Sequence, residues 1–391
     1  MAARALPPTA CCPLITAHCL VALSWDERFL ELALPLIDGC WDAAACAPLV
    51  GVWRRPVLES VHYGAVAVAS ADGTVVASHG DPRLRTYLRS SAKPFQLLGL
   101  VEHGGIERFG LDSTAVAVMA ASHGGEPQHV EAVGRILKAI DCGVGDLQCG
   151  VHPPMDASAA RALLEAGEVP TALHSNCSGK HAGMLALCRL LGEPIASYLD
   201  PEHPAQRLIR SRVAASLRVA ESDLTWGVDG CGAPAFTSSL VVMARAYAWL
   251  VEPPDQLGEL AAAARRITAA MRRHPELVGG SRGRLDTELM RLDSRFISKS
   301  GADGVFCVGV PSELAVGRPL GVALKVSDGD GATRARIPAG IEALCQLGAL
   351  ADSVQAELAR RFPGELKNVA GRVVGDIRPC YQLQRADGSN G

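Results

Sequence analysis

Strand-like segments lie near both ends of the sequence, and the long stretch between them is patterned for helices. Gly64 to Ser78 contains two runs of alanine and β-branched residues around an Asp-Gly turn, a pattern typical of a β-hairpin. Far downstream, Arg295 to Ser300 and Val305 to Val310 flank a second glycine-containing turn, and Leu320 to Val326 follows. We therefore expect one antiparallel sheet assembled from both chain ends.

Helical periodicity dominates between these strands and returns after them. A short helix is expected near Pro94, because proline is tolerated in a first turn, and Gly104 would end it. The other predicted helices are Val130 to Ile140, Ala159 to Glu165, His181 to Leu191, Ala205 to Val219, Phe236 to Leu250, Pro254 to Arg273 and Ile337 to Leu347. The pattern predicts an α/β (α+β) fold with helices on the sheet and a helical subdomain.

Composition favours a globular protein that acts on a small soluble molecule. The chain has 391 residues, of which 48% are hydrophobic and 20% charged, so it can bury a large core. Its net charge is -3, and it has no block of five or more Lys and Arg residues. This balance gives no reason to expect binding to nucleic acid or to an anionic membrane surface. It also has no uninterrupted apolar run of about 18 residues, so we predict no transmembrane helix.

The first 47 residues differ from the rest in composition. They contain clustered cysteines and little periodicity, so we interpret 1–47 as an extension and 48–391 as a single domain. The run from Cys11 to Ser24 resembles a poor signal peptide, with little charge before it and no clear cleavage site after it. The chain has 13 cysteines, an odd and scattered set, which indicates reduced thiols and a cytoplasmic protein.

Ser90 and Lys93 form an S-x-x-K pattern at the expected start of a helix. Residues three apart share one helix face, so a neutral lysine amine can accept the proton of the serine hydroxyl. Serine acyl-transfer enzymes use this arrangement with serine as the nucleophile. The pattern is short, and the alternative is a helix-capping serine followed by a surface lysine.

Two further polar segments follow in an order that suits such a site. Ser122 could relay a proton to a leaving nitrogen, whereas the neighbouring His123 fits a structural role beside a glycine turn. Lys299 could hold a substrate carboxylate, or lower the pKa of Lys93 by repulsion between like charges. The alternatives are an incidental serine and a surface lysine beside a hairpin.

Two glycine-rich turns each carry a cysteine and a charged residue. One contains Cys177, Lys180 and His181, and the other contains Asp229 and Cys231. Two thiolates suit zinc, but neither cysteine has a second one two to four residues away, as a zinc finger would. Two tight turns that hold buried cysteines are the alternative.

These segments together resemble a known family. Ser90 to Gln96, Ala121 to His123, Ser175 to Gly183 and Asp229 to Gly232 resemble the Rhizobium etli-type, thermolabile L-asparaginases, also called the class 3 or asparaginase II family. The resemblance runs from about Pro56 to about Arg378. It implies a serine β-lactamase-like fold, a homodimer, and hydrolysis of L-asparagine to L-aspartate and ammonia.

The resemblance also implies roles for residues of this sequence. The implied catalytic residues are Ser90 as nucleophile with Lys93 as its partner, and Ser122 with Lys299 as a second pair. The implied zinc ligands are Cys177, Lys180 and Cys231, with a role in substrate binding. We expect Asp229, His181 and Arg89 to bind the substrate.

The sequence therefore predicts an amidohydrolase in which Ser90 attacks the side-chain amide of asparagine. Backbone N–H groups would stabilise the oxyanion, and water would hydrolyse the aspartyl-enzyme. A glutaminase or a penicillin-recognising serine hydrolase would use the same S-x-x-K chemistry. A non-catalytic zinc or amino-acid binding protein is a third possibility, although a binding module does not need a nucleophile.

Overall fold

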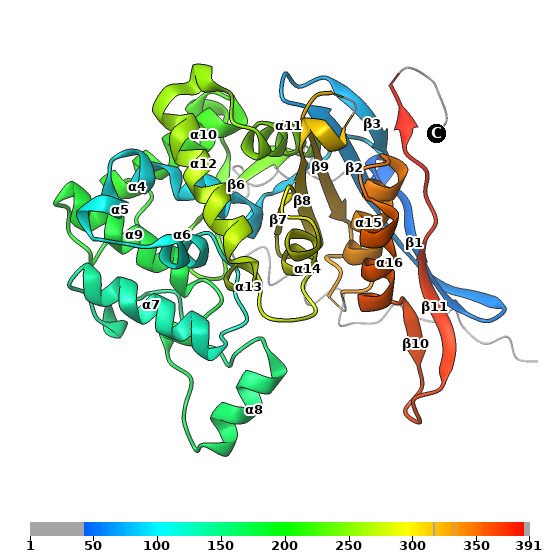
Figure 1. Ribbon diagram of the computed structural model, residues 1–391, viewed down its shortest axis with the longest axis horizontal. Coiled ribbons are helices and arrows are strands. Elements are labelled where there is room, and N and C mark those ends of the chain that lie inside the picture. The colour runs from blue at the N-terminus through cyan, green and yellow to red at the C-terminus, as the bar shows by residue number, and fades with distance from the viewer. Residues whose placement is uncertain (1–42, 316, 332, 387–391) are drawn as a thin grey trace, which may run out of the picture. The chain divides into compact units, whose positions relative to one another are not determined.

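One antiparallel sheet organises the computed structural model, which describes residues 43–315, 317–331 and 333–386. Its strand order is β10-β11-β1-β2-β9-β8-β7, with β3 paired to β2 and β12 paired to β3 (Figure 1). The strands are β1 (Ala47–Arg54), β2 (Val57–Ser70), β3 (Val75–His79), β7 (Ile297–Ser300), β8 (Val305–Val310), β9 (Leu320–Val326), β10 (Glu365–Lys367), β11 (Val373–Pro379) and β12 (Gln384–Arg385). Segments from both chain ends pair at the centre, where β2 meets β9.

Alternation along the central strand separates two hydrophobic cores. In β2, Ala65 and Ala67 face the core that includes the long helical region, whereas Val66 and Val68 face the core on the opposite side. Small residues on the first face let a helix approach closely. A Cβ atom on Gly321 of β9 would lie 1.8 Å from the carbonyl oxygen of a residue in α11 (Leu240–Val251).

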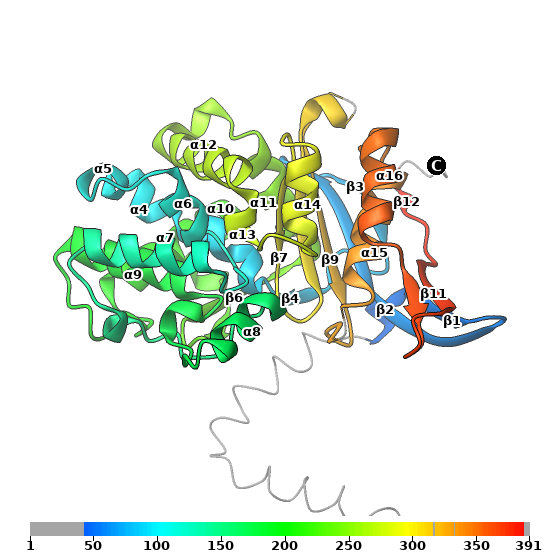
Figure 2. The ribbon, with the colours of Figure 1, turned by 60° about the horizontal axis from the view of Figure 1, so that its bottom comes forward.

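Three late helices cover the second face of the sheet. They are α14 (Leu285–Leu292), α15 (Arg336–Gln346) and α16 (Asp352–Arg361), which lie in front of the strands in Figure 2. Leu289, Leu344 and Leu358 are fully buried and belong to the same core as the valines of β2. The sheet is therefore covered by helices on both faces.

The middle of the chain builds the helical region. Its helices are α3 (Lys93–Gln96), α4 (Leu98–Glu102), α5 (Gly105–Arg108), α6 (Ser113–Met119), α7 (Pro127–Ala139), α8 (Ala157–Glu165), α9 (Ser178–Leu191), α10 (Pro204–Leu217), α12 (Gly258–Arg273) and α13 (Pro275–Val278). Helix α9 packs closely on α6, since a Cβ atom on Gly179 would lie 2.1 Å from the carbonyl oxygen of Val118. This packing places the start of α9 beside the residues that follow α6.

A small second sheet has the strand order β4-β6-β5. Strand β6 (Pro234–Ser239) pairs with β4 (Arg85–Tyr87) on one side and with β5 (Trp226–Val228) on the other. The chain leaves β4 towards Arg89 and leaves β5 towards Asp229. Residues 140 positions apart in the sequence are thereby brought to the same place.

The predicted mixed α/β architecture, with a sheet from both chain ends, is confirmed. The hairpins at 64–78 and 295–310 and the strand Leu320–Val326 are present. The helix predicted at Phe236 to Leu250 is wrong in its first turn, because 234–239 form β6 and the helix begins at Leu240. The pairing of β6 with two neighbours outweighs the apolar periodicity there.

The extension predicted at 1–47 lies mostly outside the described residues. The described part begins with a 3₁₀ turn, η1 (Ala43–Ala45), and β1 starts at Ala47. All nine cysteines within it are free thiols, in agreement with the prediction for this part. No helix in the described ranges is long and apolar enough to cross a membrane.

Candidate active site

Ser90 lies on a tightly held 3₁₀ turn, η2 (Arg89–Ala92), directly before α3. Arg89 starts this turn in the left-handed region, with φ of 50°, a conformation that costs a residue with a side chain about 1 kcal/mol or more. The hydroxyl of Ser91 donates to the carbonyl oxygen of Leu88 at 2.7 Å, and Tyr247 donates to that of Ser91 at 2.8 Å. These contacts hold the strained turn in place.

Lys93 connects the turn to two other segments. Its Nζ atom donates to the carbonyl oxygen of Ala121 at 2.5 Å and to Ser122 Oγ at 2.8 Å, and it lies 3.3 Å from Cys177 Sγ. The side chain is buried, and burial lowers its pKa; the charge of Lys180 adds to this effect while Cys177 opposes it. A lysine amine with a lowered pKa is suited to accept a proton.

The Ser90 hydroxyl makes no hydrogen bond to any residue that the structure describes, whereas its carbonyl oxygen accepts from the backbone N–H of Lys93. Ser90 as a residue is 9% exposed, and its hydroxyl is not among the fully enclosed unpartnered atoms of the described residues. Catalytic hydrogen bonds are often long or absent without substrate. The pairing of Ser90 with Lys93 stays a prediction, and the contact that is present is the one between Lys93 and Ser122.

Ser122 follows α6 and is fixed by its backbone. Its N–H donates to the carbonyl oxygen of Val278 at 3.0 Å, and its own carbonyl oxygen accepts from Arg284 Nη2 at 3.2 Å. The neighbouring His123 is fully buried, contacts Ser178 Oγ at 3.0 Å and stacks on His129. His123 therefore has the structural role that its sequence context indicated.

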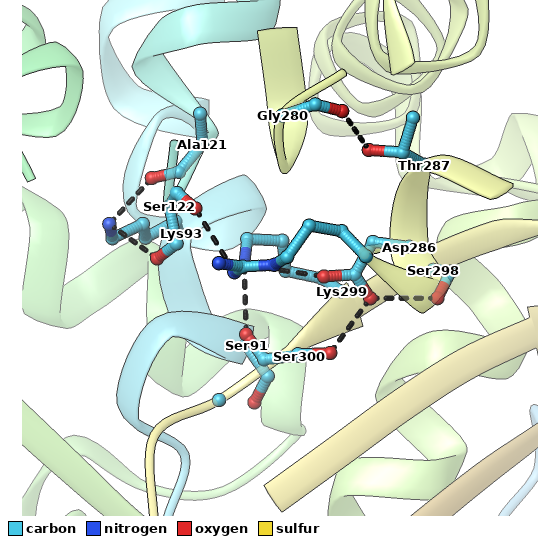
Figure 3. A network of polar contacts seen from close by, with 12 residues as sticks. Ser91, Lys93, Ala121, Ser122, Gly280, Asp286, Thr287, Ser298, Lys299 and Ser300 are labelled. Atoms are coloured by element: carbon cyan, nitrogen blue, oxygen red, sulfur yellow. Dashed lines mark hydrogen bonds and ion pairs between the residues drawn. The ribbon is translucent and has the colours of Figure 1, made fainter. Parts of the chain in front are cut away.

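Lys299 lies in the same polar network, on β7 (Figure 3). Its Nζ atom donates to the carbonyl oxygen of Ser300 at 2.8 Å and lies 3.9 Å from Asp286 Oδ2. Burial lowers the pKa of Lys299 to about 7; Asp286 opposes this shift, and the positive charge of Lys93 strengthens it. No hydrogen bond joins Lys299 to Ser122 within the described ranges, so the second serine-lysine pair also stays a prediction.

A second cluster beside Lys93 contains the side chains of Cys177, Lys180 and Cys231. Lys180 Nζ donates to Cys231 Sγ at 3.0 Å, and all three side chains are buried. A hydrogen bond from Cys231 lowers the pKa of Cys177 well below its usual value, and nearby Lys93 and Lys180 lower it further. The same hydrogen bond, together with burial, raises the pKa of Cys231. Of the two coupled thiols, Cys177 is therefore the more easily deprotonated.

This cluster fits the donor preferences of zinc. Two sulfur atoms and one amine nitrogen converge in a buried place, and zinc binds thiolate sulfur and nitrogen ligands. The described residues contain no group of three or more His, Cys, Asp or Glu side chains arranged to hold a metal, so a site here would depend on the Lys180 nitrogen as its third ligand. The residues present are therefore compatible with the ligand set that the sequence resemblance implies.

Arg89 joins the turn of Ser90 to both neighbouring loops. Its Nη2 and Nε atoms lie 2.9 and 3.1 Å from Asp229 Oδ1, and Nη1 contacts Asp303 Oδ2. The Asp229 carboxylate also accepts from the N–H of Gly230 and is 13% exposed, whereas Asp303 is 64% exposed. Two of the three predicted substrate-binding residues are thus in direct contact with each other.

His181, the third, lies deeper. Its ring is fully buried, and Nδ1 is 2.7 Å from the hydroxyl of Tyr198. Burial and the charges of Lys180 and Lys93 lower its pKa well below the usual value, which favours the neutral imidazole. In this structure its contacts anchor α9, and its role in substrate binding stays a prediction.

Sequence reasoning missed Asp286 and Arg284. Asp286 accepts hydrogen bonds from two serines of β7, and Arg284 donates to the backbone of Ser122. The available signal was the alternation around Lys299, because serines on both sides of it would face one common partner.

Comparison with known proteins assigns the family. The family model for L-asparaginase II matches residues 50–379. Among curated proteins, no significant sequence match was found. Solved structures similar to this chain include a probable glutaminase from Bacillus subtilis complexed with 6-diazo-5-oxo-L-norleucine. The two sequences are 14% identical and the TM-score is 0.32. The match covers 68% of this chain and 78% of the glutaminase chain. Another is a Bacillus glutaminase solved in the presence of 4.3 M NaCl, with 13% identity, a TM-score of 0.33, and coverage of 77% and 91%.

The family match covers most of the chain and includes every residue of the cluster described above. The chain belongs to the L-asparaginase II family and is an amidohydrolase that acts on a small amino-acid substrate.

Proposed function

We propose that the chain is an L-asparaginase that hydrolyses the side-chain amide of L-asparagine to L-aspartate and ammonia through a serine nucleophile. The observation that carries this proposal is the position of Lys93. Its buried amine, with a lowered pKa, contacts Ser122 and follows Ser90 by three residues. The family match is consistent with the same substrate class.

The proposed reaction has two halves. The Ser90 Oγ atom attacks the amide carbon while Lys93 accepts the hydroxyl proton, and backbone N–H groups stabilise the oxyanion. The carbon–nitrogen bond then breaks, and ammonia leaves with a proton delivered from Lys93 through Ser122. Water next attacks the aspartyl ester, returns a proton to Ser90 and releases aspartate. Lys299 would supply either a positive charge or a second amine close to the reacting groups.

Substrate recognition is proposed to use the loops around Arg89. Its guanidinium would bind the α-carboxylate of the amino acid, and Asp229 would both orient Arg89 and attract the α-ammonium group. His181, the residue after Lys180 in α9, would help to hold this region in place. The two charges of an amino-acid substrate would thus find opposite charges beside Ser90.

We further propose a zinc ion held by Cys177, Lys180 and Cys231, which would supply a fixed positive charge near the substrate. Binding would require a neutral Lys180 amine, so metal loading is expected to release protons. Metal analysis by mass spectrometry of Cys231→Ser and wild-type protein tests this: the wild type should hold about one zinc per chain and the variant far less. Equal zinc content in the two proteins would contradict it.

The assembly and the fold type are proposals of the same kind. A sheet with helices on both faces and an inserted helical region supports a serine β-lactamase-like fold. A homodimer is proposed on the sequence resemblance, and sedimentation equilibrium would measure it.

Ammonia release tests the function directly. Purified protein is given L-asparagine or L-glutamine, with and without chelator, and ammonia is measured by a coupled assay. The proposal predicts turnover of asparagine well above that of glutamine. Equal or faster glutamine turnover would instead make the chain a glutaminase. Hydrolysis of a chromogenic β-lactam, or binding of asparagine without ammonia release, would point to the other two classes considered.

A further inference from the structure

A buried carboxylate, that of Asp286, lies beside Lys299, and no step of the proposed reaction uses it. Both side chains are fully enclosed, with 0% exposure. Enclosing two charges is costly unless they are paired and hydrogen-bonded. The Oδ2 atom of Asp286 lies 3.9 Å from Lys299 Nζ and has no hydrogen-bond partner among the described residues. The arrangement therefore calls for an explanation beyond packing.

The other carboxylate oxygen of Asp286 holds the strand that carries Lys299. Oδ1 accepts from Ser298 Oγ and from Ser300 Oγ, each at 3.0 Å (Figure 3). Side chains alternate along a strand, so these two serines point to one face of β7 and Lys299 points to the other. One oxygen atom thus fixes the residues on both sides of Lys299.

Strand β7 needs such support because of its place in the sheet. It is the last strand of the sheet path in the described residues and pairs only with β8. Its end also lies against the turn of Ser90, since a Cβ atom on Gly301 would be 2.7 Å from the carbonyl oxygen of Leu88. A shift of β7 would therefore move Lys299 relative to Ser90.

We infer that Asp286 is a positioning residue for Lys299, which holds β7 in register with the turn of Ser90 and keeps a negative charge beside the Lys299 amine. The consequence for turnover rests on the proposed function. The consequence for the protonation of Lys299 rests on geometry alone and can be measured without substrate.

Among the described groups, Asp286 is the negative charge with the largest effect on Lys299. The titratable groups that influence Lys299 are Asp286 of α14, Arg284 before α14, Lys93 of α3, Arg336 of α15 and Cys307 of β8. Three of these are cations, which disfavour a protonated Lys299. Removing the charge of Asp286 while keeping its shape should therefore make Lys299 easier to deprotonate.

The direct test is an NMR titration of the lysine side chains. The chain has only six lysines, so lysine labelled with ¹³C and ¹⁵N gives few signals, and the Lys299→Arg variant identifies the signal of Lys299. In Asp286→Asn, the titration midpoint of Lys299 should fall by about one pH unit or more. A midpoint that moves by less than about 0.3 pH unit would overturn the inference.

Kinetics give a second measurement with matched controls. In Asp286→Asn, kcat should fall at least about tenfold, with little change in KM. In a plot of kcat against pH, the part of the curve that reflects deprotonation of Lys299 should move to lower pH. Asp286→Glu keeps the charge and should restore the position of that part of the curve. Asp293→Asn changes an aspartate at the end of the same helix, paired with Arg295, and should leave the profile unchanged.

A second pair of variants covers the case in which Asp286→Asn does not fold. Ser298→Ala with Ser300→Ala removes both hydrogen bonds to Oδ1 but keeps the carboxylate charge. The inference predicts a several-fold lower kcat and an unchanged KM; unchanged kcat would contradict it. If the wild type hydrolysed neither amide, the proposed function would fail, and the NMR titration would still decide the role of Asp286.

Discussion

The Nζ atom of Lys93 lies 2.8 Å from the Oγ atom of Ser122 and 3.3 Å from the Sγ atom of Cys177. One buried amine thus joins the hydroxyl expected to relay a proton to the sulfur cluster expected to bind zinc. The three residues come from separate parts of the sequence and meet because α9 packs tightly on α6. Proton transfer and metal binding would therefore influence each other through Lys93.

Removing the Ser122 hydroxyl should slow catalysis without harming the fold. The expected result for Ser122→Ala is a fall in kcat of about 10²–10⁴, the usual contribution of a positioned proton-transfer group. Ser216→Ala is the matched control, because Ser216 is equally buried but donates only to the carbonyl oxygen of Arg212 in α10. Steady-state ammonia release and thermal melting of both variants measure this. Wild-type turnover in Ser122→Ala would remove the relay.

The sequence predicted the general architecture because strand alternation and turn residues are local signals. The hairpins and Leu320–Val326 were found in this way. Strand β6 was missed because its apolar residues continue into α11 without a break, so periodicity alone could not show the boundary at Leu240. What decides that boundary is pairing with β4 and β5, which are distant in the sequence.

The candidate site shows the same division between local and distant information. Motifs singled out Ser90, Lys93, Ser122 and Cys177 as candidates, since each lies in a distinctive short segment. Asp286 stayed hidden, because its meaning depends on Ser298 and Ser300 facing it from another element. Short motifs also could not show which hydroxyl the Lys93 amine contacts. That contact depends on how whole segments of the chain are placed in the fold.

Lys299 should make the protein more stable as the pH rises above neutrality. Its pKa is lowered in the folded state to about 7 from the usual lysine value of 10.5, so between these pH values the unfolded chain binds a proton that the folded protein lacks. The free energy of unfolding should then increase by about 1.4 kcal/mol per pH unit from this group. Urea unfolding of wild type and Lys299→Met between pH 7.5 and 9.5 isolates this contribution, because other groups cancel in the difference. A difference that does not change with pH would contradict the lowered pKa.

Asp303 should compete with the substrate for Arg89. Each of the three guanidinium nitrogens of Arg89 contacts a carboxylate, Nε and Nη2 that of Asp229 and Nη1 that of Asp303, and Asp303 is the more exposed partner. If Arg89 binds the substrate carboxylate, Asp303→Asn should lower KM for asparagine several-fold at unchanged kcat, since an exposed ion pair is weak.

A control distinguishes this effect from a general change in charge. Asp255→Asn also removes an exposed carboxylate paired with an arginine, Arg265, and should leave KM unchanged. The gain for Asp303→Asn should also disappear for a substrate whose α-carboxylate is replaced by an amide. An unchanged or higher KM in Asp303→Asn would mean that Asp303 supports Arg89 instead of competing for it.

Gly179 should tolerate no side chain. A Cβ atom there would lie 2.1 Å from the carbonyl oxygen of Val118, so Gly179→Ala must separate α9 from α6 and should cost about 1–3 kcal/mol of stability. It should also reduce activity, because this contact places Cys177 and Lys180. Gly134→Ala in α7 is the control: nothing lies within 4 Å of its Cβ position, and alanine should stabilise that helix by about 0.5–1 kcal/mol. Equal melting temperatures for the two variants would contradict this packing.

The identity of the serine that carries the acyl group tests the central claim most directly. The enzyme is reacted with a diazoketone analogue of asparagine, digested with trypsin and mapped by tandem mass spectrometry. Trypsin separates Ser90 from Ser122 because Arg108 lies between them. The account predicts the modification on Ser90, and its absence in Ser90→Ala. Modification of Ser122 in the wild type, with Ser90→Ala still releasing ammonia at the wild-type rate, would contradict it.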